Sequence, residues 1–258
     1  MYGAIIGDLA GSIYEFDQTK SIKSVKMNKV IEDNAFFSDD SIETIAILDA
    51  VLSEKSYEEA LKEYYFKFKD YKPDFKPYFK YPFSPGFIKW AKGNSTGTSI
   101  GNGALMRVSP IPMLIDDRNE MFMHVNQATS TSHNSKEALN AASNLANIIY
   151  MAREGWSKYD ILEWNGFNLD YQPFEKFNTT CDETLQNCIT QALKANSFED
   201  AMERTLYMGG DTDTNCAIVG SMAESLYGIP DYLIEEANKK IPKEFVKTLS
   251  KGYKRINH

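Results

Sequence analysis

Residues 209–227 read GGDTDTNCAIVGSMAESLY, and this stretch decides how the chain can fold. Residues 216–227 form an apolar run with the character of a buried helix. Two glycines, which permit a turn that a side chain would forbid, precede Asp211, Asp213 and Thr214. The oxygens of these side chains are hard ligands, which suit Mg²⁺, Ca²⁺ or Mn²⁺ better than zinc. Since Asp and Thr also cap helices, a plain N-cap is an equally good interpretation.

An EF-hand calcium loop can be excluded for this motif. Such a loop, if it began at Asp211, would need Gly at its sixth position and Glu at its twelfth. Those positions hold Cys216 and Met222. If the motif binds a cation, further ligands must therefore come from another part of the chain.

A second acidic cluster, Ser38-Asp39-Asp40-Ser41, offers such ligands. The segment after it has helical spacing, with apolar residues on one face at Ile42, Ile45, Ala46, Leu48 and Val51. The cluster is thus also a good N-cap with acids in the first turn. Both acidic clusters open apolar helices, and four carboxylates converge if the two helix starts meet. Close carboxylates cannot all stay ionised without a cation between them. This arrangement predicts a dinuclear site, with metals ~3.5–4 Å apart.

Composition narrows the class of protein. The chain has 258 residues, enough for a full core, and a net charge of −8 from 36 acids and 28 bases. That balance argues against non-specific nucleic-acid binding, which relies on basic surface. Three cysteines lack metal-ligand spacing and read as reduced thiols: Cys181, Cys188 and Cys216. With no signal peptide apparent and no apolar run near the ~20 residues of a membrane span, we expect a cytoplasmic protein without a membrane segment.

The remaining pattern is mostly helical. Helices are expected at 57–71, 135–153, 157–164, 182–195, 197–208, 214–227, 230–240 and 242–253. Period-two alternation is scarce and no β-α-β rhythm appears, so the sequence predicts an all-α fold, a compact orthogonal multi-helix bundle. No domain boundary is evident, and residues 1–258 are expected to form a single domain. A long irregular region, 72–112, holds six of the nine prolines, and irregular segments of that length are often functional.

A glycine-rich motif, GTSIGNGALMR at 97–107, lies in this irregular region. It is neither a Walker loop nor a dinucleotide fingerprint. Its backbone amides can still cradle a pyrophosphate, although a plain flexible loop is the simpler interpretation. The N-terminal segment is also rich in glycine and is followed by Glu15, which stands between two aromatic residues. Glu15 is either a proton-transfer group with a raised pKa or a surface residue. His133, just before a helix, either lies near the cap or contacts a phosphate or ribose.

Together, five segments resemble the ADP-ribosylglycohydrolase family, of the dinitrogenase-reductase-activating glycohydrolase type. That family shows G-D-x-x-G followed by an acid, T-D-D-T, G-N-G-x-x-M-R, a T-x-H or S-H element, and G-G-D-T-D-T. The matching segments here are 7–15, 38–41, 101–107, 132–133 and 209–214, in the family order. Each match is weak alone, but five in order are specific.

The resemblance implies an all-α fold with a dinuclear Mg²⁺ or Mn²⁺ cleft. The positions that match metal ligands are Ser38, Asp39, Asp40, Asp211, Asp213 and Thr214. The positions that match the ADP-ribose contacts are Gly101, Asn102, Gly103 and His133. The carboxylates expected to handle protons in catalysis are Glu15, Asp40 and Asp211. Ser38 stands where the family usually has Thr, which keeps the hydroxyl. Ser99 replaces an aromatic often found before the glycine loop, and Phe87 or Trp90 is the candidate substitute.

The implied activity is metal-dependent hydrolysis that removes ADP-ribose from modified proteins by cleaving the glycosidic bond at the anomeric carbon. The transition state of that bond is oxocarbenium-like. The acceptor is left open: Glu15 leans towards serine linkages, whereas arginine is equally compatible. Two alternatives are an inactive, crystallin-like binding or structural member and another dinuclear-metal hydrolase, such as a phosphodiesterase. The expected partner is ADP-ribose or an ADP-ribosylated protein. Nucleic acid is expected only as an ADP-ribosylated substrate, and the protein is expected to be a monomer by default.

Overall fold

The computed structural model describes residues 1–15, 25–75, 82–171, 174 and 176–256, and within these ranges it is helical without a β-strand. The helices are α1 (Tyr2–Gly11), α3 (Asp39–Ser53), α4 (Tyr57–Phe68), α5 (Pro85–Ala91), α6 (Gly103–Met106), α7 (Pro110–Leu114), α8 (Arg118–Ser130), α9 (Lys136–Arg153), α10 (Lys158–Asn165), α11 (Cys181–Lys194), α12 (Phe198–Met208), α13 (Thr212–Tyr227), α14 (Asp231–Lys240) and α15 (Lys243–Ile256). The predicted all-α fold is confirmed, and most predicted helices differ from these bounds by one to three residues at either end.

The region 72–112 is less irregular than the sequence suggested, because its described part contains α5, α6 and α7. Two of its prolines stand in the first turn of a helix rather than outside one. Pro85 follows the cap Ser84, whose side chain accepts a hydrogen bond from the Phe87 amide, and Pro110 opens α7. The fixed φ of proline suits the first helical turn, where its missing N–H is not needed.

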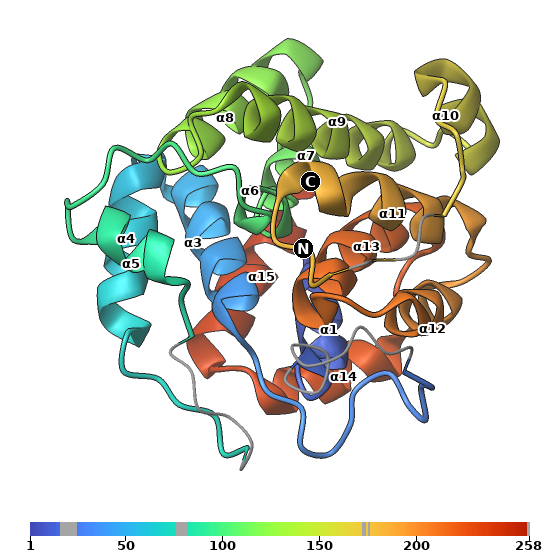
Figure 1. Cartoon of the computed structure of the whole chain (residues 1–258), viewed down its shortest axis with the longest axis horizontal. Helices are drawn as coiled ribbons and strands as arrows, with labels where there is room; N and C mark the ends of the chain where they lie inside the picture. The colour runs from blue at the N-terminus through green and yellow to red at the C-terminus, as the bar shows by residue number, and fades with distance from the viewer. Residues whose placement is uncertain (16–24, 76–81, 172–173, 175, 257–258) are drawn as a thin grey trace.

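Helix α13 lies in the middle of the molecule beside α1 (Figure 1). Every residue of α13 from 212 to 224 is buried, which is the pattern of a core helix rather than a surface one. Helices α9, α11 and α12 pack against it, and α3 packs against α1. The carboxyl end of α1 and the amino ends of α3 and α13 therefore meet inside the fold.

The N-terminal glycines belong to a helix, not to a ligand-binding loop like the one at 97–107. They recur every fourth residue and face α13. A Cβ at Gly3, Gly7 or Gly11 would lie 2.0 to 2.1 Å from a carbonyl oxygen of that helix. No side chain fits at that distance, so glycine is what allows the two backbones to touch. This close approach places the side chain that follows Gly7 against the start of α13.

The three cysteines are all buried and free, as expected. Among the described helices, none combines the length and the apolar character that crossing a bilayer requires.

Candidate functional site

A pocket with a volume of about 780 Å³ opens where these helix ends meet. Its size falls in the range of sites that take a drug-sized or nucleotide-sized ligand. The described residues that line it come from distant parts of the chain, namely Glu15, Ser38, Asp39, Asp40, Glu43, residues 82–88, Trp90, Ser95, Thr98, Ser99, residues 101–103, Met106, Ser132, His133, Phe177, Thr179, Asp211, Asp213 and Thr214. All the residues predicted from sequence to bind metal or ligand are in this one pocket.

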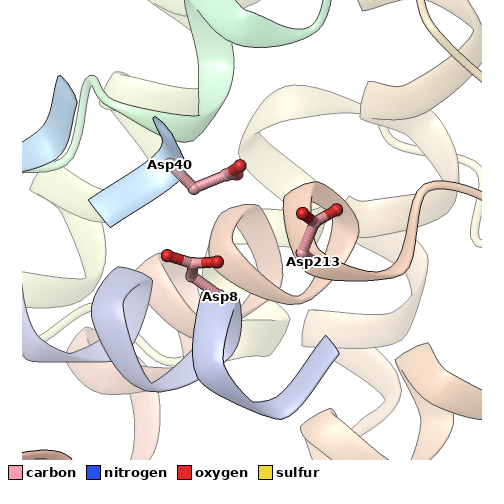
Figure 2. Close-up of side chains that lie close together, drawn as sticks. All are labelled: Asp8, Asp40 and Asp213. Atoms are coloured by element: carbon pink, nitrogen blue, oxygen red, sulfur yellow. The ribbon is translucent and has the colours of Figure 1, made fainter. Parts of the chain in front are cut away.

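The two acidic helix starts do converge. The Thr214 hydroxyl lies 3.4 Å from Asp40 Oδ2. One carboxylate oxygen from each of Asp8, Asp40 and Asp213 lies within 4.8 Å of the others, and Figure 2 shows these side chains turned towards one another from α1, α3 and α13. The convergence that was a condition in the sequence argument is thus present in the fold.

Asp8 is the member of this cluster that sequence reasoning missed. Its side chain is fully buried, and its Oδ2 accepts hydrogen bonds from the amide of Ser38 (2.8 Å), the amide of Ser41 (3.1 Å) and the Ser41 hydroxyl. Within the described part of the chain, its Oδ1 has no hydrogen-bond partner, and neither has Oδ1 of Asp40. Two buried carboxylate oxygens left without a donor are atoms that a cation would satisfy.

The structure shows which of these side chains cap their helices. Ser38 caps α3, since its hydroxyl accepts from the Asp40 amide. Asp211 occupies the N-cap position of α13, but its side chain makes no capping bond. Instead, Asp211 Oδ2 accepts from the Asn102 side chain (2.8 Å), and its amide donates to Asn178 Oδ1 (2.8 Å). The Asp211 carboxylate therefore faces the pocket and not its own helix.

The electrostatics of the buried carboxylates also favour a site for cations. Burial, followed by the repulsion of neighbouring carboxylates, raises the pKa of Asp39, Asp40 and Asp213 well above the usual range. Burial also raises the pKa of Asp8 to about 6, although its hydrogen bonds oppose the shift. Because ionised carboxylates this close repel one another, the cluster needs either protons or cations. Hard oxygen donors of this kind fit Mg²⁺ or Mn²⁺.

Glu15 lies just past the end of α1 and is half-buried in the pocket wall. One of its carboxylate oxygens lies within 4.8 Å of those offered by Asp211 and Asp213. The predicted catalytic acid is therefore next to the predicted metal ligands. Its raised pKa stays a prediction.

The glycine loop is pinned on both sides. On one side, the Asn102 amide donates to the Thr179 carbonyl (2.9 Å), and on the other, the Ser99 amide donates to the Ser132 carbonyl (3.2 Å). A Cβ at Gly101 or at Gly103 would lie 3.6 Å from Nε2 of His133. The loop is thus a fixed wall of the pocket rather than a flexible connection.

Aromatic side chains form part of the pocket wall. Phe87 and Trp90, suggested as substitutes for the aromatic missing at Ser99, both line the pocket, and their ring centroids are 5.2 Å apart. Phe177 lines it as well. Planar apolar faces beside carboxylates and backbone amides suit a ligand with both an aromatic base and polar groups.

Fold and site define an all-α protein with a buried cluster of carboxylates that fits divalent cations, beside a glycine loop. A family model, ADP-ribosylglycohydrolase, matches residues 1–257, and the chain belongs to that family.

The chain is similar to a curated protein and to a solved structure. ADP-ribosylarginine hydrolase Tri1 of Pseudomonas putida (strain GB-1) is 25% identical over an alignment of 157 residues, with 55% of this chain and 42% of that protein covered. The chain thus spans less than half the length of this curated relative. A solved structure, described as an ADP-ribosylglycohydrolase-related protein complex, has a TM-score of 0.71 and 18% identity, with 99% of this chain and 92% of that chain covered. At that identity the likeness concerns the fold alone.

Proposed function

We propose that this protein is a metal-dependent hydrolase that removes ADP-ribose from modified proteins. The observation that carries the proposal is the meeting of three buried carboxylates, Asp8, Asp40 and Asp213, two of which keep an oxygen without a hydrogen-bond donor among the described residues. Asp40 and Asp213 line the same pocket as the glycine loop that resembles a pyrophosphate cradle, and Asp8 lies directly behind them.

The residues proposed to hold two Mg²⁺ or Mn²⁺ ions are Ser38, Asp39, Asp40, Asp211, Asp213 and Thr214, with Asp8 either as a further ligand or as the anchor of the Ser38–Ser41 turn. Bound cations would orient ribose hydroxyls and lower the pKa of a water. Asp8 and Asn178 fix the backbones of the two ligand clusters by direct hydrogen bonds, so the ligands sit on rigid elements.

In the proposed reaction, the oxygen of water forms a bond to the anomeric carbon while the bond from that carbon to the acceptor side chain breaks. Positive charge builds on the sugar in the transition state. The carboxylates proposed to handle protons are Glu15, Asp40 and Asp211. Glu15 is the most suitable of the three, because the other two also serve as proposed metal ligands. Glu15 would take a proton from the water and pass it to the leaving acceptor, so that the protons balance.

The acceptor is proposed to be arginine. None of the described residues that line the pocket is Lys or Arg, whereas six are Asp or Glu: Glu15, Asp39, Asp40, Glu43, Asp211 and Asp213. Two divalent cations would offset only part of the charge of six carboxylates, so the wall still favours a cationic acceptor over a neutral serine. The name of the relative Tri1, an ADP-ribosylarginine hydrolase, points the same way.

The proposal is tested with defined substrates. Proteins or peptides carrying ADP-ribose on Arg, Ser or Glu, and ADP-ribosylated DNA, are incubated with the protein, with and without EDTA, and free ADP-ribose is quantified. A simple phosphodiester serves as the control for a different metal hydrolase. The proposal predicts that ADP-ribose is released from the arginine substrate when EDTA is absent, and that EDTA abolishes this release. No release from any ADP-ribosylated substrate, with binding of ADP-ribose retained, would favour an inactive binding protein instead. Asp211→Asn is expected to abolish release, and full activity in that variant would exclude the dinuclear mechanism.

A further inference from the structure

His133 is held by a buried chain of polar side chains that the proposed reaction has not used. Arg107 is 1% exposed, and its Nη1 donates to Glu43 Oε2 at 2.7 Å. Its Nη2 donates to the Ser132 hydroxyl oxygen at 2.7 Å and lies 3.5 Å from Nδ1 of His133. The Ser132 hydroxyl in turn lies 2.8 Å from the same Nδ1.

The order of these contacts determines which ring nitrogen carries the proton. A guanidinium group only donates hydrogen bonds, so the Ser132 oxygen accepts from Arg107 and its own hydrogen is free to point at Nδ1. The guanidinium group beside Nδ1 can only donate, and the Ser132 hydroxyl is free to donate, so the arrangement that satisfies both groups has Nδ1 as the acceptor. A neutral imidazole then carries its hydrogen on Nε2.

Nε2 of His133 points to the glycine loop. Cβ atoms placed on Gly101 and on Gly103 would both lie 3.6 Å from it, so this nitrogen faces the two glycines that line the pocket. Burial, together with the charge of Arg107, lowers the pKa of His133 well below its ordinary value, which keeps the ring neutral. The ring consequently presents an N–H, and no positive charge, beside the loop.

We propose that Arg107 is a positioning residue: through Ser132 it locks His133 in the Nε2–H tautomer, so that the ring donates a hydrogen bond to an oxygen of the ADP-ribose held by the glycine loop. This inference rests on the proposed function. A donor without charge suits a pocket that already faces cations, because it binds a phosphate or ribose oxygen and does not repel the metals. The Arg107–Glu43 pair also ties this donor to α3, the helix that begins with Asp39 and Asp40.

The test uses Arg107→Lys as the main variant. Lysine keeps the charge that Glu43 requires but lacks the planar fork that reaches Glu43 and Ser132 together. Removing the charge altogether would strand a buried carboxylate and risk the fold. Ser132→Ala is the second variant, since it removes the hydroxyl and leaves the Arg107–Glu43 pair intact. Arg118→Lys is the matched control, because Arg118 likewise donates through two guanidinium nitrogens, in its case both to Asn147, and both residues are outside the pocket lining.

Two readouts are needed. The first is the tautomer of His133 in the ligand-free protein, by ¹⁵N NMR of the imidazole, which is tractable because the chain has only three histidines and His133→Gln identifies the signal. The second is the Kd for free ADP-ribose by calorimetry. We expect a pure Nε2–H tautomer from pH 5 to 8 in the native protein and in Arg118→Lys. We expect mixed tautomers and about tenfold weaker ADP-ribose binding in Arg107→Lys and Ser132→Ala.

The possible results separate this inference from the proposed function. An Nδ1–H or cationic His133 in the native protein overturns the lock, whatever the protein catalyses. A native tautomer and native Kd in both variants overturn the role of Arg107. A locked tautomer in a native protein that has no affinity for ADP-ribose removes the proposed ligand and so contradicts the donor role as well as the proposed function. Mixed tautomers and weaker ADP-ribose binding in Arg107→Lys and Ser132→Ala, with native behaviour in Arg118→Lys, support the positioning role of Arg107.

Discussion

Replacing Asp8 by Asn is expected to make the metal-free protein more stable and to weaken its response to divalent cations. Asp8 is fully buried against Asp40 and Asp213, and no cation is needed to hold its Oδ2, which already accepts from Ser38 and Ser41. An Asn at this position keeps an acceptor oxygen for those donors. Its amide nitrogen then replaces Oδ1, which has no hydrogen-bond donor among the described residues, and can donate to a neighbouring carboxylate.

The magnitude follows from the pKa of Asp8, which burial raises from 3.8 to about 6. A group whose folded pKa is raised binds its proton more tightly in the folded state, so the stability it confers is complete below pH 3.8 and is lost as pH rises through about 6. At pH 7 the ionised Asp8 therefore costs up to ~3 kcal/mol of unfolding free energy. Asp8→Asn should recover much of that at pH 7 in EDTA and little of it near pH 4.

The assay is urea unfolding followed by circular dichroism, at pH 7 and near pH 4 with EDTA, and at pH 7 with Mn²⁺. Native protein should gain about 2.7 kcal/mol with the ion at a hundred times its Kd, and Asp8→Asn clearly less. Asp116→Asn is the control, since it makes the same change in charge on a side chain that is 99% exposed and outside the pocket lining. It should stay within ~0.5 kcal/mol of native in every condition. Destabilisation of Asp8→Asn in EDTA at pH 7, or an undiminished Mn²⁺ effect, would refute this reasoning.

Three further perturbations address the packing, the catalyst and the support of the site. Gly7→Ala places a Cβ 2.0 Å from an α13 carbonyl oxygen and should lower the unfolding free energy in urea by about 3 kcal/mol or more. Gly86→Ala is the control, because the nearest atom to its Cβ is 4.0 Å away, and it should change stability by no more than ~1 kcal/mol. Equal effects of the two substitutions would contradict the close approach of α1 and α13. Glu15→Gln should lower ADP-ribose release at least ~100-fold with a native unfolding curve, and full turnover would remove its assigned role. Asn178→Ala leaves the buried Asp211 amide without its acceptor and should cost ~1–3 kcal/mol while weakening Mn²⁺ binding by calorimetry; native values for both would show that Asn178 does not position Asp211.

Local signals in the sequence were sufficient to find the two helix starts that build the site. A helix N-terminus is predicted by residues that lie within one turn of it, such as Ser38 with the acids that follow and the glycines before Asp211. Capping residues and apolar spacing together therefore locate the starts of α3 and α13. The expectation of an irregular region at 72–112 was wrong at its three helices, for a related reason. Proline reads as a helix breaker in the sequence, but Pro85 and Pro110 stand where a helix tolerates it.

Long-range partners could not be found in this way. Asp8 is separated by about thirty residues from the turn it anchors, and Asn178 by 33 residues from the Asp211 amide. The signal for Asp8 was a carboxylate within the apolar, glycine-spaced helix α1, where a charged side chain is expensive unless it has a partner. The contact of Arg107 with Glu43, 64 residues apart, carries no local pattern at all. Such contacts depend on tertiary packing, which a periodicity does not describe.

The most direct test of the central claim, that this acidic pocket uses divalent cations to remove ADP-ribose, is the rate of ADP-ribose release from an arginine-modified protein by EDTA-stripped enzyme titrated with Mn²⁺. The account predicts no release before Mn²⁺ is added and recovery that is complete when two ions are bound per chain, as counted by calorimetry on the same sample. Release that proceeds at full rate in EDTA, or that never appears when both ions are bound, would contradict it.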